Sequence, residues 1–312
     1  MSDNTVVIAS DNNYIWGVWI LIASMRKNAM TEPVMVLASN YSKTDIEVLE
    51  QFPDVKVIPH HDPSHRNPTC AKPDVMLLPD TEYVTWADCD GMFFGNCSKY
   101  LTADPEHIHI RMRSVKDNIQ VFSNHYAPDE QAGIPEHILA IWRKDVGENY
   151  EPAIKTCGSA CFISVHRNHR LFLKKWQNLI EKVLPNDNVG VCDKRSPAYF
   201  QTDESALNAV LCFAKDAPLP TSDFMLDKDP DAYFIHFAYQ PKPWQMWSSY
   251  AAKHFDKVMA LIDWSAAQGY KLPGPLPMSL NKKYKAVNLL LARFSKHYLH
   301  LLKLLHILHL HK

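Results

Sequence analysis

Glycine is scarce in this sequence. Nine glycines occur among 312 residues, whereas an average usage of about 7% would give roughly 22. No two are spaced as Gly-x-Gly, so the glycine-rich dinucleotide loop, the Walker phosphate loop and the Gly-x-Ser-x-Gly nucleophile elbow are absent. If the chain binds a nucleotide, we expect it to do so without a glycine-rich phosphate loop.

Patterns for disulfide frameworks, zinc ribbons and membrane spans are also missing. The seven cysteines are scattered and odd in number, and none forms a Cys-x-x-Cys pair. No run of 18 apolar residues occurs, and the first residues lack the basic and apolar regions of a signal peptide. We therefore expect a reduced, cytoplasmic protein.

Acidic residues are missing from the end of the chain. After Asp263 there is no Asp or Glu, while the preceding part carries 25 basic and 34 acidic residues. This asymmetry predicts a separate basic segment. Its eight basic residues are Lys271, Lys282, Lys283, Lys285, Arg293, Lys296, Lys303 and Lys312.

Strand and helix patterns alternate through most of the chain. This order predicts an α/β fold with a mainly parallel sheet, in which ligands bind beyond the carboxyl ends of the strands. Strands are expected at 5–10, 34–38, 55–59, 81–87, 107–112, 160–165 and 233–237. Helices are expected at 15–25, 44–52, 135–144, 167–184, 203–214 and 253–268.

Two proline-rich stretches interrupt this order. Residues 60–79 are expected to form a loop, and 271–277 (KLPGPLP) are expected to separate two parts. The predicted organisation is therefore a domain over 1–265, followed by a boundary and a basic amphipathic tail over 266–312.

Two acids and a histidine lie at the carboxyl ends of predicted strands. Asp88 and Asp90 come directly after the strand 81–87, and His236 lies in the strand 233–237. Carboxylates spaced i, i+2 at a strand end can turn toward one Mg²⁺ or Mn²⁺ ion, which prefers oxygen ligands and often bridges phosphates. Asp and Gly are also common in ordinary turns, so Asp-x-Asp alone is weak support for a metal site.

Two further segments, a basic motif and a polar turn, also follow predicted strands. Lys242-Pro243-Trp244 follows His236, and an ammonium there can neutralise a phosphate. Residues 9–14 (ASDNNY) leave the first strand, where polar groups can bind a base and a ribose while a tyrosine ring stacks on the base.

Taken together and in this order, the motifs resemble the family 8 retaining glycosyltransferases, which include glycogenin and bacterial lipopolysaccharide galactosyl- and glucosyltransferases. The similarity covers about residues 5–250. It implies the GT-A fold, a single domain with a mainly parallel, Rossmann-like central sheet, here with a C-terminal helical tail. The A-x-D-x-N-Y turn, the Asp-x-Asp, the D-Q-D-x-L-N helix start and the His followed by K-P-W carry the similarity.

The resemblance implies transfer of a hexose, from UDP-Gal or UDP-Glc, to a glycan or lipid-linked acceptor in cell-surface polysaccharide or lipopolysaccharide synthesis, with retention of configuration. It implies Mn²⁺ (or Mg²⁺) as the cofactor, with Asp88, Asp90 and His236 as its ligands. Asp203 and Glu204 are the candidate catalytic residues. The candidate donor-binding residues are Ala9, Asp11, Asn13, Tyr14, Lys72, Asp88 and Lys242.

The chain departs from the family at several positions. Glu204 stands where the family has glutamine beneath the sugar, Ser205 replaces an acid, Cys157-Gly158-Ser159 replaces the usual N-x-G, and Lys72 matches only loosely the basic residue before the Asp-x-Asp. Glu204 could act as a nucleophile, or Asp203 and Glu204 could only stabilise charge and orient hydroxyls. Acids at a helix start are also favoured by the helix dipole alone.

The basic tail predicts a membrane partner. Leu290, Phe294, Tyr298, Leu301, Leu305 and Leu308 fall on one helical face, and Arg293, Lys296, His297, His300 and Lys303 on the other. This pattern is typical of an interfacial helix on anionic lipid, so we expect a peripheral protein at the inner membrane face. A helix packed on the protein itself or at a dimer contact is the alternative, and no nucleic acid partner is expected.

Two other function classes remain open at this stage. A sugar nucleotidyltransferase also combines an α/β fold with metal-binding acids, but generally uses a glycine-rich, basic loop after its first strand, which residues 11–14 lack. Glu204 and Ser205 leave room for a non-catalytic glycan-binding or scaffold protein. Hydrolysis of a nucleotide-sugar would separate a transferase from a scaffold.

Overall fold

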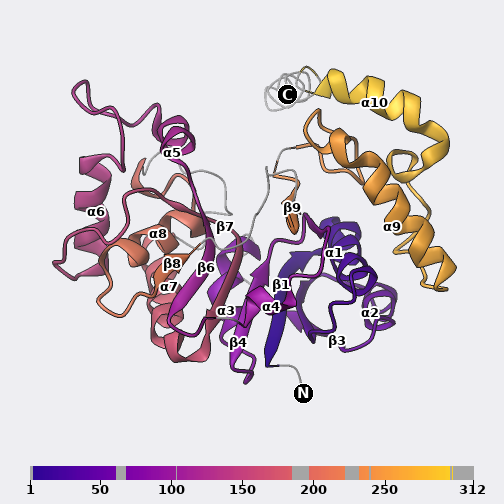
Figure 1. Ribbon diagram of the computed structural model, residues 1–312, viewed down its shortest axis with the longest axis horizontal. Helices are drawn as coiled ribbons and strands as arrows, with labels where there is room; N and C mark the ends of the chain where they lie inside the picture. The colour runs from indigo at the N-terminus through magenta and orange to yellow at the C-terminus, as the bar shows by residue number, and fades with distance from the viewer. Residues whose placement is uncertain are drawn as a thin grey trace, which may run out of the picture.

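The computed structural model describes residues 3–60, 68–102, 104–184, 197–221, 232–238, 240–295 and 297. Within these residues, a central seven-stranded sheet has the order β3-β2-β1-β4-β7-β6-β8 (Figure 1). Only β7 runs antiparallel to the other strands of this sheet, so the predicted mainly parallel α/β fold is confirmed. The strands are β1 (Asn4–Asp11), β2 (Val34–Ser39), β3 (Val55–His60), β4 (Tyr83–Ala87), β6 (His107–Met112), β7 (Gly158–His166) and β8 (Leu219–Thr221).

Hydrophobic cores cover both faces of the sheet. On β1, Val6 and Ile8 belong to a core shared with α1 and α9, whereas Val7 and Ala9 belong to a core shared with α3, α6, α7 and α8. Because successive strand residues point to opposite faces, a run of apolar residues is what a strand buried on both sides requires. The helices are α1 (Ile15–Lys27), α2 (Lys43–Glu50), α3 (Lys72–Met76), α4 (Ser98–Leu101), α5 (Val115–Phe122), α6 (Glu136–Val146), α7 (Arg170–Val183), α8 (Asp203–Phe213), α9 (Phe255–Ala267) and α10 (Lys285–Arg293).

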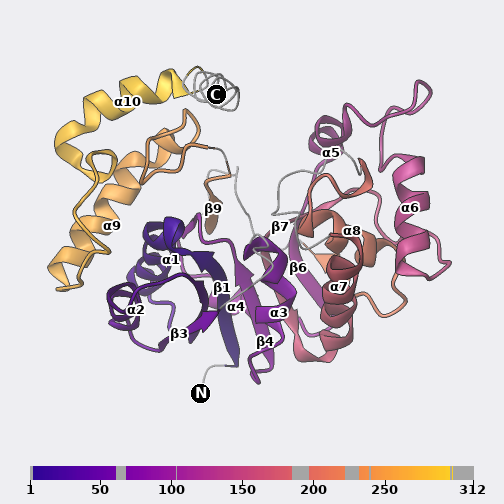
Figure 2. The ribbon, with the colours of Figure 1, turned by 180° about the vertical axis from the view of Figure 1, so that it is seen from behind.

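Seen from either side, the helices gather toward two ends of the molecule. Helices α1, α2, α9 and α10 lie toward one end with β1 to β3, and α5 to α8 lie toward the other end with β6 and β8 (Figures 1 and 2). Strands β1 and β4 are adjacent and parallel in the middle of the sheet. Their carboxyl ends therefore lie side by side at one end of the strands, between the two groups of helices.

A small second sheet lies beyond this end of the strands. Strands β5 (Gly91–Phe93) and β9 (Phe234–His236) are antiparallel, with Gly91 opposite His236. The backbone N–H of Phe237 also donates to the carbonyl of Asp90 at 2.8 Å. This pairing ties the turn after β4 to a segment that is distant in the sequence.

Three short helices, α3, α4 and α5, were not expected from the sequence. The prediction of a loop over 60–79 is wrong for α3, where Pro73 lies in the first turn, at a position that leaves no helical hydrogen bond broken. Helix α5 begins after Ser114, whose hydroxyl accepts a hydrogen bond from the N–H of Asp117 at 3.1 Å. Residues 61–67 lie outside the described part of the chain.

The start of the predicted tail contacts the first domain. The indole N–H of Trp19 donates to the carbonyl of Lys271 at 3.0 Å, and that of Trp247 donates to the carbonyl of Ser279 at 2.7 Å. Leu280 and Ala292 are buried in the same core as α1 and α9. The domain division at residue 266 stays a prediction. The predicted tail packs on this core as far as residue 295.

No helix of the described residues is long and apolar enough to cross a membrane. Residues 298–312, which include Tyr298, Leu301, Leu305 and Leu308 of the predicted apolar face, lie outside the described residues.

Gly91→Ala tests the close contact between β5 and β9. A Cβ at Gly91 would lie 2.1 Å from Cζ of Phe234, a buried ring that cannot move aside cheaply. We expect the free energy of unfolding to fall by about 1–3 kcal/mol, measured by urea denaturation. Gly274→Ala is the control, because a Cβ there meets no atom within 4 Å. Equal stability of the two variants would contradict this account of the β5–β9 contact.

Candidate active site

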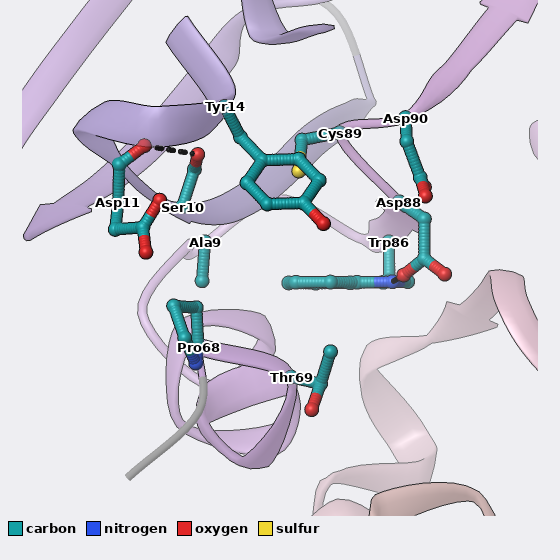
Figure 3. A pocket seen from close by; sticks show the side chains of 10 residues that line it. All are labelled: Ala9, Ser10, Asp11, Tyr14, Pro68, Thr69, Trp86, Asp88, Cys89 and Asp90. Atoms are coloured by element: carbon teal, nitrogen blue, oxygen red, sulfur yellow. Dashed lines mark hydrogen bonds between the residues drawn. The ribbon is translucent and has the colours of Figure 1, made fainter. Parts of the chain in front are cut away.

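A pocket opens at the carboxyl ends of β1 and β4. Its cavity is about 160 Å³, and the side chains that line it point inward from three segments (Figure 3). Open parallel sheets bind ligands at this place. The lining residues are Ala9, Ser10, Asp11, Tyr14, Pro68, Thr69, Trp86, Asp88, Cys89 and Asp90.

Asp88, Asp90 and His236 converge beside this pocket. One ligand atom from each lies within 4.8 Å of the other two. Nε2 of His236 is 3.4 Å from Oδ2 of Asp88 and 3.0 Å from Oδ1 of Asp90. Two carboxylates and one imidazole fit Mn²⁺ or Mg²⁺, so the donor atoms present match the cofactor that the sequence implied.

Backbone pairing brings the three groups together. Asp88 and Asp90 lie between β4 and β5, and the β5–β9 ladder places His236 opposite Gly91. Helix α1 supports the turn from behind, since a Cβ at Gly17 would lie 2.4 Å from the carbonyl oxygen of Cys89. The position of the cluster is therefore fixed by main chain rather than by long side chains.

Two cations neutralise Asp90. Its Oδ2 lies 2.5 Å from Nζ of Lys242, which also donates to the carbonyl of Phe237 at 2.8 Å. Burial alone would raise the pKa of Asp90, but His236 and Lys242 outweigh burial and hold this pKa below its usual range. Burial opposes a charged imidazole at His236, yet Asp90 raises the pKa of His236 well above its ordinary value.

Lys72 joins Asp88 to Asp203. Its Nζ is 3.0 Å from Oδ1 of Asp88 and 3.0 Å from Oδ2 of Asp203, and it donates to the carbonyl of Ala160 at 3.0 Å. The ammonium is therefore surrounded by two carboxylate oxygens and one carbonyl oxygen of the protein. The side chain is 3% exposed, so Lys72 organises two carboxylates, and its predicted contact with the donor stays a prediction.

Glu204 is paired with Arg113, which the sequence analysis did not single out. Nη2 of Arg113 donates to Oε1 of Glu204, and the N–H of Ala160 donates to Oε2 at 2.8 Å. Burial would raise the pKa of Glu204, but Arg113 outweighs burial and lowers it. Arg113 directly follows β6, so applying the strand-end rule to the predicted strand 107–112 would have found it.

The polar turn after β1 shapes the other side of the pocket. The carboxylate of Asp11 accepts from the N–H of Asn13 at 3.0 Å and from its amide at 3.3 Å. The Tyr14 ring lies edge-on to Trp244 with centroids 5.6 Å apart, and Gln240 donates to its hydroxyl at 3.2 Å. Ala9, Asp11 and Tyr14 line the pocket, whereas Asn13 is exposed and turns its amide toward Asp11.

The structure therefore brings together most residues proposed from the sequence. Ala9, Asp11, Tyr14, Asp88 and Asp90 line one pocket, and His236, Lys242, Lys72 and Asp203 join it through the contacts above. Ser10, Thr69, Trp86 and Cys89 also line the pocket and had no sequence signal of their own. The roles of all these side chains stay predictions.

Comparison with known proteins identifies the fold. The glycosyltransferase GlyE of Streptococcus pneumoniae TIGR4 is 13% identical with a TM-score of 0.54, over 87% of this chain and 65% of GlyE. The bifunctional glycosyltransferase WbbM is 15% identical with a TM-score of 0.51, over 78% of this chain and 47% of WbbM. The chain has the GT-A glycosyltransferase fold.

This likeness has limits in length and sequence. The chain spans about half of WbbM and about two thirds of GlyE. The galactosyltransferase LgtC, solved with donor and acceptor sugar analogues, is 14% identical with a TM-score of 0.47, over 90% of this chain and 99% of LgtC. No family model matches the sequence, and no curated protein is similar to it.

Mn²⁺ titration tests the metal cluster directly. His236→Ala and Asp90→Asn are expected to weaken Mn²⁺ binding about 10- to 100-fold relative to the wild type. Because Asp90 raises the pKa of His236, Mn²⁺ must displace a proton, and its affinity is expected to fall as the pH falls. Calorimetry in buffers of different ionisation enthalpy measures both the affinity and the released proton.

His107→Ala is the matched control for this titration. His107 also lies beside an acid, with Nδ1 2.6 Å from Oδ2 of Asp104, but it is not part of the Asp88–Asp90–His236 cluster. Mn²⁺ affinity that survives His236→Ala unchanged would show that the cluster is not the metal site.

Proposed function

We propose that this chain is a metal-dependent glycosyltransferase of the family 8 type. It transfers a hexose from a nucleotide-sugar, UDP-Gal or UDP-Glc, to a glycan or lipid-linked acceptor, with retention of anomeric configuration, in cell-surface polysaccharide or lipopolysaccharide synthesis. The observation that carries the proposal is the convergence of Asp88, Asp90, His236 and Lys242 at the pocket of a GT-A fold.

The chemistry follows from where charge develops. A nucleoside diphosphate leaves as an anion, and a cation held by the cluster would stabilise that charge. Lys242 is buried beside Asp90 of the cluster and would add a second positive charge. Asp11 and Tyr14 are placed to hold the nucleoside, and Asp203 and Glu204 to act on the sugar.

Donor hydrolysis tests the proposal. We expect the purified chain with Mn²⁺ to release UDP from UDP-Gal or UDP-Glc in the absence of acceptor, and chelation of the metal to stop the release. Asp88→Asn and Asp90→Asn are expected to abolish it. Pyrophosphate release from a nucleoside triphosphate and a sugar phosphate would instead indicate a nucleotidyltransferase, and binding of glycan without turnover would indicate a scaffold.

Lys242→Met isolates the charge on the leaving group. We expect kcat to fall by about 10²-fold with saturating donor and Mn²⁺, as for other contacts to developing charge. Because Lys242 also neutralises buried Asp90, thermal melting is measured alongside to confirm a folded variant. Lys43→Met, at an exposed lysine on α2, is the control. Unchanged kcat in a folded Lys242→Met variant would rule out this role.

The C-terminal segment supports a further part of the proposal, peripheral attachment to an anionic membrane. Asn288, Ala292 and Ser295 face the protein, whereas Leu290 and Phe294 of the predicted apolar face are 55% and 56% exposed. Lys282 and Lys285 pair with Asp263 and Asp256 of α9, but these pairs are exposed and contribute little. An exposed apolar face beside basic residues is suited to the interface of an anionic bilayer.

Leu290→Glu combined with Phe294→Glu tests this attachment. We expect the variant to lose sedimentation with vesicles that contain phosphatidylglycerol, while hydrolysis of soluble donor is unchanged. Point changes are sharper than truncation after residue 277, which would also remove buried Leu280 and Ala292. Leu171→Glu, at a 70% exposed leucine on α7, is the control. Equal sedimentation of both variants would contradict the attachment.

A further inference from the structure

Two consecutive acids at the start of α8 are held by different cations. Asp203 lies 3.0 Å from Nζ of Lys72, which also holds the metal-cluster residue Asp88. Glu204 is bound by Arg113. The two acids therefore pair with different cations, although Ala160 lies between the two pairs, since its carbonyl accepts from Lys72 and its N–H donates to Glu204.

Both carboxylate oxygens of Glu204 accept hydrogen bonds. Oε1 accepts from Arg113, and Oε2 accepts from the N–H of Ala160 at 2.8 Å. Arg113 is itself fixed, because its backbone N–H donates to the carbonyl of Cys157 at 2.9 Å and its Nη1 lies 3.4 Å from the carbonyl of Gly158. The Glu204 carboxylate thus has a set orientation, and its side chain is 14% exposed.

The backbone before these acids is strained. Thr202 has φ 50° and ψ −118°, in the region that disfavours a β-branched residue. Such conformations cost about 1–3 kcal/mol and persist where the surroundings enforce them. The hydroxyl of Thr202 also donates to Oδ1 of Asp203 at 3.0 Å. This conformation directly precedes the first turn of α8, where Asp203 and Glu204 meet their separate cations.

We propose that Arg113 is a positioning residue that keeps Glu204 a fixed carboxylate, so that Glu204 stabilises positive charge on the donor sugar and forms no bond to it. This inference rests on the proposed function. A nucleophile needs a free lone pair aimed at the anomeric carbon, and charge-assisted hydrogen bonds to both oxygens reduce that availability. Stabilising an oxocarbenium-like sugar by charge needs no such bond.

The transfer step balances without a covalent enzyme intermediate. The bond between the anomeric carbon and the diphosphate oxygen breaks with its electron pair on the diphosphate. The acceptor oxygen forms the new bond on the same face, and its proton passes to a diphosphate oxygen. Glu204 keeps its negative charge throughout. Arg113 lowers the pKa of Glu204, which agrees with an ionised side chain.

Substitutions at both ends of the pair test the inference. Arg113→Met and Glu204→Gln are each expected to lower kcat by about 10²-fold, with the Mn²⁺ dissociation constant unchanged because Lys72 holds Asp88 separately. Arg113→Lys is expected to recover part of kcat. In the Glu204→Gln background, Arg113→Met is expected to have no further effect, because Arg113 acts through Glu204.

Arg111→Met is the matched control and is expected to keep wild-type kcat. Arg111 lies two residues earlier and has Nη2 3.4 Å from Oδ2 of Asp117, an acid outside the proposed site. Arg113→Met alone leaves the Glu204 charge buried without its cation, and this variant can therefore unfold. The double variant Arg113→Met/Glu204→Gln removes both charges, so it keeps the test available in that case.

Three results would overturn the inference while the wild type stays active. The first is a wild-type kcat in folded Arg113→Met. The second is a fall in kcat of the double variant that equals the product of the falls in the two single variants. The third is a glycosyl adduct on Glu204 in mass spectra of the protein during turnover. A wild-type chain that releases no UDP from either donor would contradict the proposed function itself, and with it this inference.

Discussion

Four carboxylates meet at the carboxyl ends of the central strands, and their mutual repulsion must be countered for the site to exist. Asp88, Asp90, Asp203 and Glu204 are all largely covered, where unpaired charge is costly. Lys72, Lys242 and Arg113 supply three positive charges beside these acids, and Asp90 raises the pKa of His236. These groups offset much of the negative charge before any ligand arrives.

This charge compensation bears on the proposed function. A divalent cation at the Asp88–Asp90–His236 cluster would add two positive charges to a site whose carboxylates are already paired. The diphosphate of a nucleotide-sugar would bring negative charges that offset them. Under the proposed function, the metal is therefore expected to bind more tightly together with the donor than alone.

Much of this arrangement was accessible from the sequence. The strand and helix pattern predicted the α/β sheet, because buried parallel strands and their crossover helices have distinct periodicities. The Asp-x-Asp, His236 and Lys242 were found because each lies at or after the end of a predicted strand. Arg113 also follows a predicted strand, whereas its pairing with Glu204, which is far away in the chain, is evident only from the fold. The buried ion pairs could not be predicted, since they depend on strand order and on the antiparallel insertion of β7 between β4 and β6.

Helix α3 and strand β5 show a second limit. Helix α3 lies in a proline-rich stretch whose local signal is that of a loop, and contacts with β1, β4 and α7 favour the helix. Strand β9 lies within the predicted strand 233–237, whereas its partner β5 has three residues, too few for a periodicity to be read. In both cases tertiary contacts override a weak local preference.

The β5–β9 ladder also sets when the site can form as the chain folds. Closing it joins residues 91 and 236, so a large loop must lose its freedom before His236 reaches the two aspartates. Contacts of such high sequence separation form slowly. A ribosome-bound chain that ends before β9 carries the two aspartates but lacks both His236 and Lys242. The Asp88–Asp90–His236 cluster is thus completed only in the last quarter of synthesis, after most of the central sheet can already pair.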